Sequence, residues 1–242
     1  MAELKFTSQD MSAFGDALRT MDQGANSMEM VANRVVRYLF ENLVDRDTGE
    51  RACVLVRFFK THPYIDLDHE LQQVVVRTLG RQPSSDRTRC LTLVATIGEQ
   101  PEWCSRQSSL SHRAIPLESP EMILRSPMIS QLISQLGLDL ASVVEPDPNL
   151  VVDLERKTYN VFYVPQAIGS AYVSDQEEFV KRFGVQSVLG FGGMLALGDL
   201  FAVILFSRLQ ISKDTAHMFT PLALSTKIAL LPFVNKAVFE RS

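Results

Sequence analysis

The side chains with the clearest chemical potential gather in one irregular, serine-rich stretch, residues 99–120. Cys104 stands two residues before Arg106 and eight before His112. Nearby cations can stabilise a cysteine thiolate, the nucleophilic form of the side chain. The grouping leaves two alternatives: a reactive thiol at Cys104, or an inert cysteine in a loop beside Trp103. We favour the inert cysteine, because the sequence does not allow Cys104 to be placed in a pair with another cysteine.

The cysteines and histidines of the sequence give little indication of a metal site or a disulfide. Cys53, Cys90 and Cys104 are an odd number and lack the CxxC spacing of zinc sites. A lone histidine that ligates haem is an alternative, but an exposed or hydrogen-bonded histidine is the favoured reading of each. No two of the four share a metal-ligand spacing: His62, His69, His112 and His217. We therefore predict no metal, and the sequence leaves the cofactor unknown.

Aromatic residues suggest a ligand cavity between a sheet and its cover. Pockets are mostly apolar, with a few polar groups that orient the ligand. Tyr159 and Phe162 join the aromatic candidates, although plain core packing is favoured for Phe162 and Phe191. Arg106, His112 and Gln166 are the polar candidates. The predicted ligand-binding residues are Trp103, Cys104, Arg106, His112, Tyr163, Gln166, Tyr172 and Phe191.

Three glycines, at positions 190, 192 and 193, look superficially like part of a phosphate-binding loop. Such a loop lies between a strand and the N-terminus of a helix. These glycines fall inside an apolar run that reads as a strand, where glycine marks a bulge or a close approach of ligand or backbone. We favour close packing.

The elements that must position these residues follow from apolar periodicity. Strands are expected at residues 52–59, 90–97, 158–164, 186–194 and 200–208. Helices are expected at residues 27–44, 67–79, 127–136 and 212–231, with shorter ones within 1–24 and 175–183. Pro221 is expected to kink or split the last long helix. The last two strands form a hairpin, so we predict an α+β fold with a mostly antiparallel central sheet flanked by helices.

Composition excludes several classes of protein. The 242 residues carry a net charge of −4 and a pI near 5.6, which argues against binding nucleic acid. The N-terminus lacks the pattern of a secretory signal, and the longest apolar runs are too short to span a bilayer. We expect a cytoplasmic protein with reduced cysteines.

The C-terminal third resembles a GAF domain, on the segments SVLGFGGML, LGD, LFAVILFSR and the closing FTPLALSTKIALLPF. More narrowly, YNVFYVPQAIGSAYV and the segments after it resemble GAF-like input regions of bacterial histidine kinases and diguanylate cyclases. Two departures matter. Ser105 follows Cys104 where bilin-binding GAF domains often have histidine, and the Asn-Lys-x-n-Phe-x-x-x-Asp-Glu motif of cyclic-nucleotide-binding GAF domains is absent.

The resemblance implies a sensory module that binds a small ligand or a partner and relays a signal through its terminal helices. We expect a GAF-like domain over residues 27–233, an extension or short helix at 1–26 and a tail at 234–242. The chain is expected to be a stand-alone sensor or the input piece of a longer one. Expected partners are a small molecule, a signalling output protein or domain, and a second copy through the terminal helices. The alternatives are a thiol-dependent redox enzyme, similar to methionine sulfoxide reductase, and a protein–protein adaptor without ligand.

Overall fold

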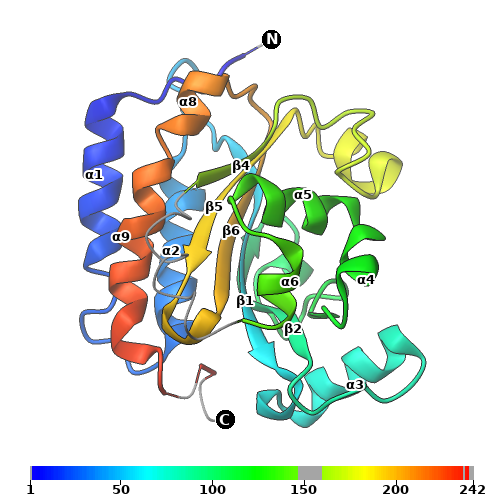
Figure 1. Cartoon of the computed structure of the whole chain (residues 1–242). Helices are drawn as coiled ribbons and strands as arrows, with labels where there is room; N and C mark the ends of the chain where they lie inside the picture. Colours follow the sequence, from blue (N-terminus) through cyan, green and yellow to red (C-terminus); the bar gives the residue numbers. More distant parts are fainter. Residues whose placement is uncertain (1, 147–159, 237, 240–242) are drawn as a thin grey trace.

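A six-stranded antiparallel sheet forms the centre of the computed structural model, which describes residues 2–146, 160–236 and 238–239 (Figure 1). The strands lie in the order β3-β2-β1-β6-β5-β4, and every neighbouring pair is antiparallel. The predicted α+β fold is confirmed, as is the hairpin of β5 and β6. The strands are β1 (Cys53–Pro63), β2 (Arg89–Gly98), β3 (Ala114–Pro116), β4 (Asn160–Val164), β5 (Ser187–Met194) and β6 (Leu200–Ser207).

The middle of the sheet is covered on both faces. Along β1, Val56 and Phe58 pack into one apolar cluster, while Leu55 and Phe59 pack into another on the opposite face. Successive side chains of a strand point to opposite faces, so a strand covered on both needs apolar residues throughout. This explains the near-continuous apolar runs of β1 and β6, and it makes any polar residue within them notable.

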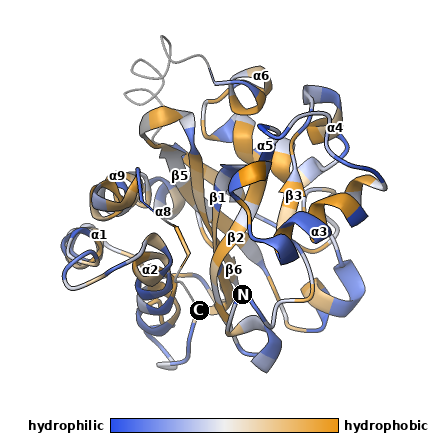
Figure 2. Ribbon diagram, turned by 90° about the horizontal axis from the view of Figure 1, so that it is seen from below, coloured by the Kyte–Doolittle hydropathy of each residue, from blue (hydrophilic) through white to orange (hydrophobic). Residues whose placement is uncertain are grey.

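One face of the sheet is covered by a layer of helices, seen on the left of Figure 1 and edge-on in Figure 2. Thr7 caps the first helix through a capping box with Asp10, and the Ser27 hydroxyl accepts from the Met30 N–H at the start of the second. The predicted break near Pro221 is confirmed, because two helices replace one long helix there. The helices of this layer are α1 (Ser8–Arg19), α2 (Met28–Asn42), α8 (Lys213–His217) and α9 (Thr220–Leu230).

The other face is covered by short helices and loops, which we call the cap. Three elements near the cap were not predicted from the sequence. β3 lies within residues 99–120, which were expected to be irregular, α4 begins at the last of these residues, and α6 follows the helix predicted at 127–136. A single π-helical turn, Gln176–Lys181, occupies the predicted short helix. The helices of the cap are α4 (Pro120–Leu124), α5 (Pro127–Gln135) and α6 (Leu140–Val144). The remaining helix, α3 (His69–Leu79), packs on Cys90 and Ala114, which strand alternation turns away from the cap-side residues Leu91 and Ile115. Short 3-10 turns lie at Tyr64–Asp66, Pro101–Trp103, Ala196–Gly198 and Leu231–Phe233.

Close packing accounts for the glycines of β5. A Cβ at Gly192 would lie 2.9 Å from the Ala202 Cα and closer still to the carbonyl oxygen of Phe201. At Gly190 it would lie 3.0 Å from the Val203 carbonyl oxygen. Both obstacles are backbone atoms of β6, which cannot turn aside as a side chain can. The structure therefore supports the interpretation that these glycines permit close approach of β5 and β6.

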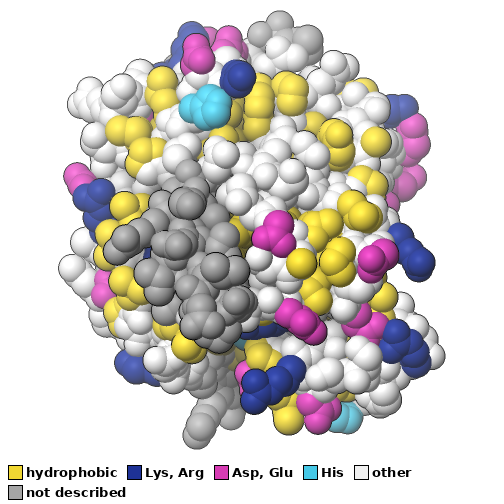
Figure 3. Space-filling view, viewed as in Figure 1, with side chains coloured by type: hydrophobic (Ala, Val, Ile, Leu, Met, Phe, Trp, Pro, Cys, Tyr) yellow, Lys and Arg dark blue, Asp and Glu magenta, His cyan; other side chains and the backbone are white. Residues whose placement is uncertain are grey.

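The longest apolar runs of the sequence were expected to be too short to span a bilayer. In the described part of the chain, no helix is both long and apolar enough to cross a bilayer. On the face shown in Figure 3, acidic and basic side chains are interspersed. Residues 158 and 159, at the start of the third predicted strand, lie outside the described residues.

Candidate functional site

A cavity of about 240 Å³ lies between the sheet and the cap. The sheet contributes its floor through alternate residues of β1 and β6, including Leu55, Phe59 and Phe206. The cap contributes α5 and two loops, residues 101–113 and 173–179. Most of the lining is apolar, which is typical of small-molecule sites. The residues that line the cavity and are themselves exposed are Ser111, His112, Ser174, Asp175 and Glu178, and they form its mouth.

Arg57 is the unexpected member of this floor. It lies in the middle of β1, where Thr96 of β2 and Ile204 of β6 are its cross-strand neighbours. Strand alternation places it on the cap side, between Leu55 and Phe59, and it is 8% exposed. Sequence reasoning missed this residue. A signal existed, because Arg57 is the single charged residue in the predicted strand ACVLVRFF.

The guanidinium of Arg57 has little to interact with. Its Nη1 lies 3.5 Å from Nδ1 of His112, and its Nε has no hydrogen-bond partner among the described residues. Burial lowers the pKa of Arg57 to about 10, so the group stays protonated at neutral pH. The same part of the chain offers it no ion-pair partner. The cavity therefore contains a desolvated positive charge.

His112 completes the polar part of the cavity. A guanidinium can only donate, so Nδ1 of His112 accepts and its proton is carried by Nε2. The ring keeps an exposed outer surface. Desolvation of the ring, followed by the charge of Arg57, lowers the pKa of His112, and Asp175 opposes this weakly. His112 and Asp175 both have positive φ, at 58° and 56°, a backbone conformation found in only a few per cent of non-glycine residues. The two loops of the mouth thus each carry one such residue.

Trp103 is held firmly in the wall. Its ring packs edge-on against Phe179 and Phe183, with centroid distances of 5.5 Å and 4.8 Å. It also lies against Gly98, where a Cβ would come within 2.8 Å of the indole. Trp103 is the only tryptophan in the sequence, so its emission reports on this cavity alone.

The structure brings only two of the eight predicted ligand-binding residues, Trp103 and His112, to this cavity. Cys104 is exposed, and its thiol donates at 3.4 Å to the carbonyl oxygens of Gly98 and Gln100. Arg106 turns to the other side of its loop, where its Nε donates to Glu29 Oε1 at 2.6 Å. Trp103, Cys104 and Arg106 are close together in sequence, yet the first lines the cavity, the second is exposed and the third pairs with α2.

The other predicted residues lie elsewhere. Tyr163, Gln166 and Tyr172 line a separate, shallow groove beside α5. The Tyr163 hydroxyl donates to the Ile211 carbonyl oxygen, which fixes the ring. Phe191 is fully buried on the opposite face, among the side chains of the helical layer. Neighbouring side chains of a strand point to opposite faces, and the position of Phe191 in β5 places its ring on the face away from the cavity.

A polar cluster closes the end of the sheet near the C-terminal segment. Asp199 accepts from Lys60 Nζ at 2.6 Å and also from Arg89. Beside it, His62 is 4% exposed, its Nδ1 lies 3.2 Å from the Lys60 carbonyl oxygen, and its ring stacks on Phe239. Burial and then the charge of Lys60 lower the pKa of His62 well below 6.5. The three charged side chains of this cluster are paired with one another, whereas Nε2 of His62 has no hydrogen-bond partner among the described residues.

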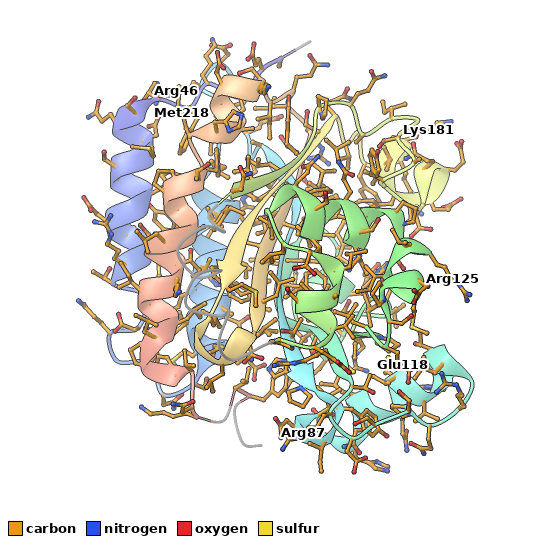
Figure 4. All side chains as sticks on the ribbon, in the orientation of Figure 1. Arg46, Arg87, Glu118, Arg125, Lys181 and Met218 are labelled. Carbon is orange, nitrogen blue, oxygen red and sulfur yellow. The ribbon has the colours of Figure 1, made fainter. Side chains whose placement is uncertain are left out.

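Metal and thiol chemistry gain no geometric support. Among the described residues, no group of three or more His, Cys, Asp or Glu side chains is placed to hold a metal ion. All three cysteines are free, and burial raises the pKa of Cys53 and of Cys90 to about 12. In Figure 4, which has the orientation of Figure 1, Lys181 and Arg125 lie at the outer edge of the cap.

Comparison with known proteins gives structural neighbours only. No protein-family model matches the chain, and no curated protein matches it. A GAF domain of a phosphoenolpyruvate-protein phosphotransferase from Acinetobacter aligns at 12% identity over 90% of this chain and 92% of that one, with a TM-score of 0.41. The phycocyanobilin-bound GAF domain of a cyanobacterial phytochrome aligns at 9% identity over 94% and 96%, with a TM-score of 0.43.

A third neighbour is the N-acylhomoserine lactone-dependent LuxR family transcription factor CepR2 from Burkholderia cenocepacia. It aligns at 9% identity over 93% of this chain and 94% of that one, with a TM-score of 0.37. The expected similarity to GAF domains is therefore found among solved structures. Similarity at this level concerns the fold and gives no information on ligand or activity.

Proposed function

We propose that this protein is a non-catalytic sensory module that binds a small molecule in the cavity between sheet and cap and relays its occupancy to the terminal segments. One observation carries the proposal. The loop of residues 99–113 lines the cavity, and it also contacts α2 and the C-terminal segment.

The contacts of this loop run in two directions. Trp103 and His112 face the cavity. Between them in sequence, Arg106 forms an ion pair with Glu29 in the first turn of α2, and its Cζ lies 4.2 Å from the ring centroid of Phe239. The Glu29 N–H in turn donates to the Val238 carbonyl oxygen at 2.9 Å. The loop, α2 and the C-terminal segment thus share one set of contacts.

This arrangement supports a relay for a physical reason. A ligand shifts a conformational equilibrium only through a difference in its affinity for the two states. A ligand that contacts Trp103 and His112 favours one position of the loop, and Arg106 transmits that position to Glu29 and Phe239. The relay therefore needs only small movements of side chains that already touch.

The deciding experiment is native mass spectrometry of the purified protein beside its denatured mass. Extra mass that disappears on denaturation, together with slower hydrogen exchange at residues 28–32 and 234–239 in the loaded protein, is the expected result. Loaded protein with unchanged exchange in both segments would contradict the relay. Protein that carries no ligand from its host and none from a metabolite extract would contradict the sensory function.

We propose that the output is received by a second copy of the chain or by a signalling domain that packs on α9. Three large apolar residues on the outer side of the C-terminal helix are well exposed: Leu224 at 44%, Ile228 at 40% and Leu231 at 49%. Their spacing of four and three residues places them on one helical face. If the partner is a second copy, sedimentation will show a dimer that Ile228→Glu converts to a monomer, with Lys213→Glu as control. A wild-type monomer at high concentration would exclude the second copy.

The redox alternative has less support than the sensory one. Cys104 lies outside the cavity, and the two other thiols are buried with raised pKa values. The free thiols are compatible with the reducing, cytoplasmic location that we propose for this protein. A Cys104→Ser variant that still binds ligand and loses a peroxide- or sulfoxide-consuming turnover of the wild type would favour the redox alternative.

A further inference from the structure

The charge of Arg57 differs from that of four other basic side chains in its surroundings. Four other basic side chains with little exposure each form an ion pair with a carboxylate. Arg57 lies at a cavity, its Nε is unpartnered within the described residues, and its nearest polar contact is an imidazole. The four paired side chains are Lys60 and Arg89 with Asp199, Arg106 with Glu29, and Arg113 with Glu70.

A desolvated charge without a counter-ion is unfavourable unless something compensates it. The guanidinium has five N–H donors in a planar fork, which matches the two oxygens of a carboxylate. A bound anion is the compensation that the geometry allows, because the cavity lies directly beside Arg57.

The rest of the cavity limits the shape of that anion. Its walls are apolar, with Leu91, Trp103, Met128, Ile129 and Leu132 among them. A water molecule occupies about 30 Å³ in the liquid, and covalently bonded atoms lie closer together than separate water molecules, so about 240 Å³ holds roughly eight to ten non-hydrogen atoms. The complementary molecule therefore has a compact apolar body of that size.

The mouth limits its charge. Asp175 and Glu178 both line the cavity, so the lining contains two carboxylates and one guanidinium. A single negative charge placed on Arg57 is attracted, whereas each additional negative charge meets the two carboxylates. This favours a carboxylate over a phosphate dianion.

We propose that the cavity is a binding site for a monocarboxylate with an apolar body of about ten non-hydrogen atoms in all, held by its carboxylate on Arg57. Binding is non-covalent. The inference rests on the proposed function, because it names the chemical class of the molecule that the sensory site takes.

The test uses Trp103 as the probe. The protein is titrated with octanoate, with 1-octanol as the uncharged molecule of equal chain length, with octylamine as the cation and with pentyl phosphate, which has as many non-hydrogen atoms as octanoate, as the dianion. Octanoate is expected to change the emission of Trp103 saturably and to bind at least 10-fold more tightly than the other three. Arg57→Gln is expected to weaken octanoate about 10- to 100-fold and to leave octanol unchanged, because a hydrogen bond to a charged group is lost.

Two further variants serve as an alternative to Arg57→Gln and as a control. Arg57→Met removes the charge and keeps an apolar side chain of similar length, so it answers the question if Arg57→Gln does not fold. Arg125→Gln, an exposed arginine of the same cap that does not line the cavity, is the matched control and should not alter binding.

Two outcomes overturn the inference. Equal affinity for octanoate and octanol, insensitive to both Arg57 variants, would leave an apolar pocket without anion recognition. No binding of octanoate at millimolar concentration would also overturn it. Neither outcome decides the sensory function, which is tested by ligand mass and hydrogen exchange of the protein loaded from its host.

Discussion

Nη1 of Arg57 lies 3.5 Å from Nδ1 of His112, and this contact joins the floor of the cavity to its mouth. Arg57 is fixed by the sheet, whereas His112 sits in a loop with positive φ. The pair thus combines a rigid cation with a titratable group in a segment that contacts solvent.

The first prediction is that carboxylate binding strengthens as the pH falls from about 8 to about 6. Desolvation and the charge of Arg57 lower the pKa of His112 in the free protein. A bound carboxylate offsets that charge and raises the pKa of His112 again, so the complex takes up a proton. Titration of octanoate in buffers of different ionisation enthalpy measures this uptake. In His112→Gln the pH dependence should disappear, and an unchanged slope would show that His112 is not the titrating group.

The second prediction concerns stability and His62. Its pKa is lowered well below 6.5 by burial, then by Lys60, with a smaller effect of Arg89, so the folded protein keeps the ring neutral. The unfolded chain binds the proton at higher pH than the folded chain. This contribution to stability is therefore present above pH 6.5 and is lost as the pH falls below it.

Thermal unfolding at a series of pH values measures this effect. The melting temperature of the wild type should fall as the pH is lowered from about 7.5 to about 5.5, and that of His62→Gln should fall less. His217→Gln, at an exposed position, is the control and should follow the wild type. Parallel curves for wild type and His62→Gln would contradict the prediction.

The third prediction is that Gly192→Ala destabilises the fold by about 3 kcal/mol. The new methyl group would meet the backbone of β6 at Phe201 and Ala202. Gly190→Ala, where the nearest backbone atom is 3.0 Å away, should cost less. Urea unfolding of both variants tests the order. If Gly192→Ala left the free energy of unfolding unchanged, β5 and β6 would move apart more easily than their close packing suggests.

The fourth prediction concerns the clamp formed by Arg106, Glu29 and Phe239. Arg106→Met breaks an ion pair whose side chains are 11% and 8% exposed, so a loss of about 3 kcal/mol is expected. Hydrogen exchange should increase in the first turn of α2 and at residues 234–239. Phe239→Ala should increase exchange in the same segments, whereas Arg182→Met, at an exposed pair, should not. Increased exchange spread evenly over the sheet would indicate general destabilisation and not release of a clamp.

The fifth prediction is that one thiol reacts in the folded protein and three react in the unfolded chain. Cys104 is exposed, while Cys53 and Cys90 are buried and burial raises their pKa values to about 12. Iodoacetamide labelling followed by intact mass measurement counts the modified thiols. Cys104→Ser should leave none reactive under native conditions. Rapid labelling of Cys90 would reveal local opening near α3.

The elements with strong local signals were predictable from the sequence. The helix expected at residues 127–136 forms as α5, with Pro127 as its first residue and Gly137 just beyond its end. Ser126 makes no side-chain cap there, so the proline and the apolar period were sufficient. The hairpin of β5 and β6 and the break near Pro221 also depend on residues close in the chain. Local rules identify such elements because their hydrogen bonds and turns join near neighbours.

Elements that depend on distant partners were not predictable. β3 has three residues, and it is a strand only because Cys90, Leu91 and Thr92 of β2 pair with it. The short helices α4 and α6 are too brief to show an apolar period and are stabilised by packing on their neighbours. A sequence window of a few residues contains no information about such pairing.

The site shows the same division. The sequence determined that Trp103 and His112 stand in one irregular loop and that Arg57 interrupts an apolar strand. Tertiary structure alone decided that Arg57 and His112, 55 residues apart, meet at one cavity, and that Phe191 faces the opposite side of the sheet. The physical reason is that composition and periodicity fix which residues a strand or loop contains, whereas the register of neighbouring strands and the packing of the cap fix which of their side chains share a space.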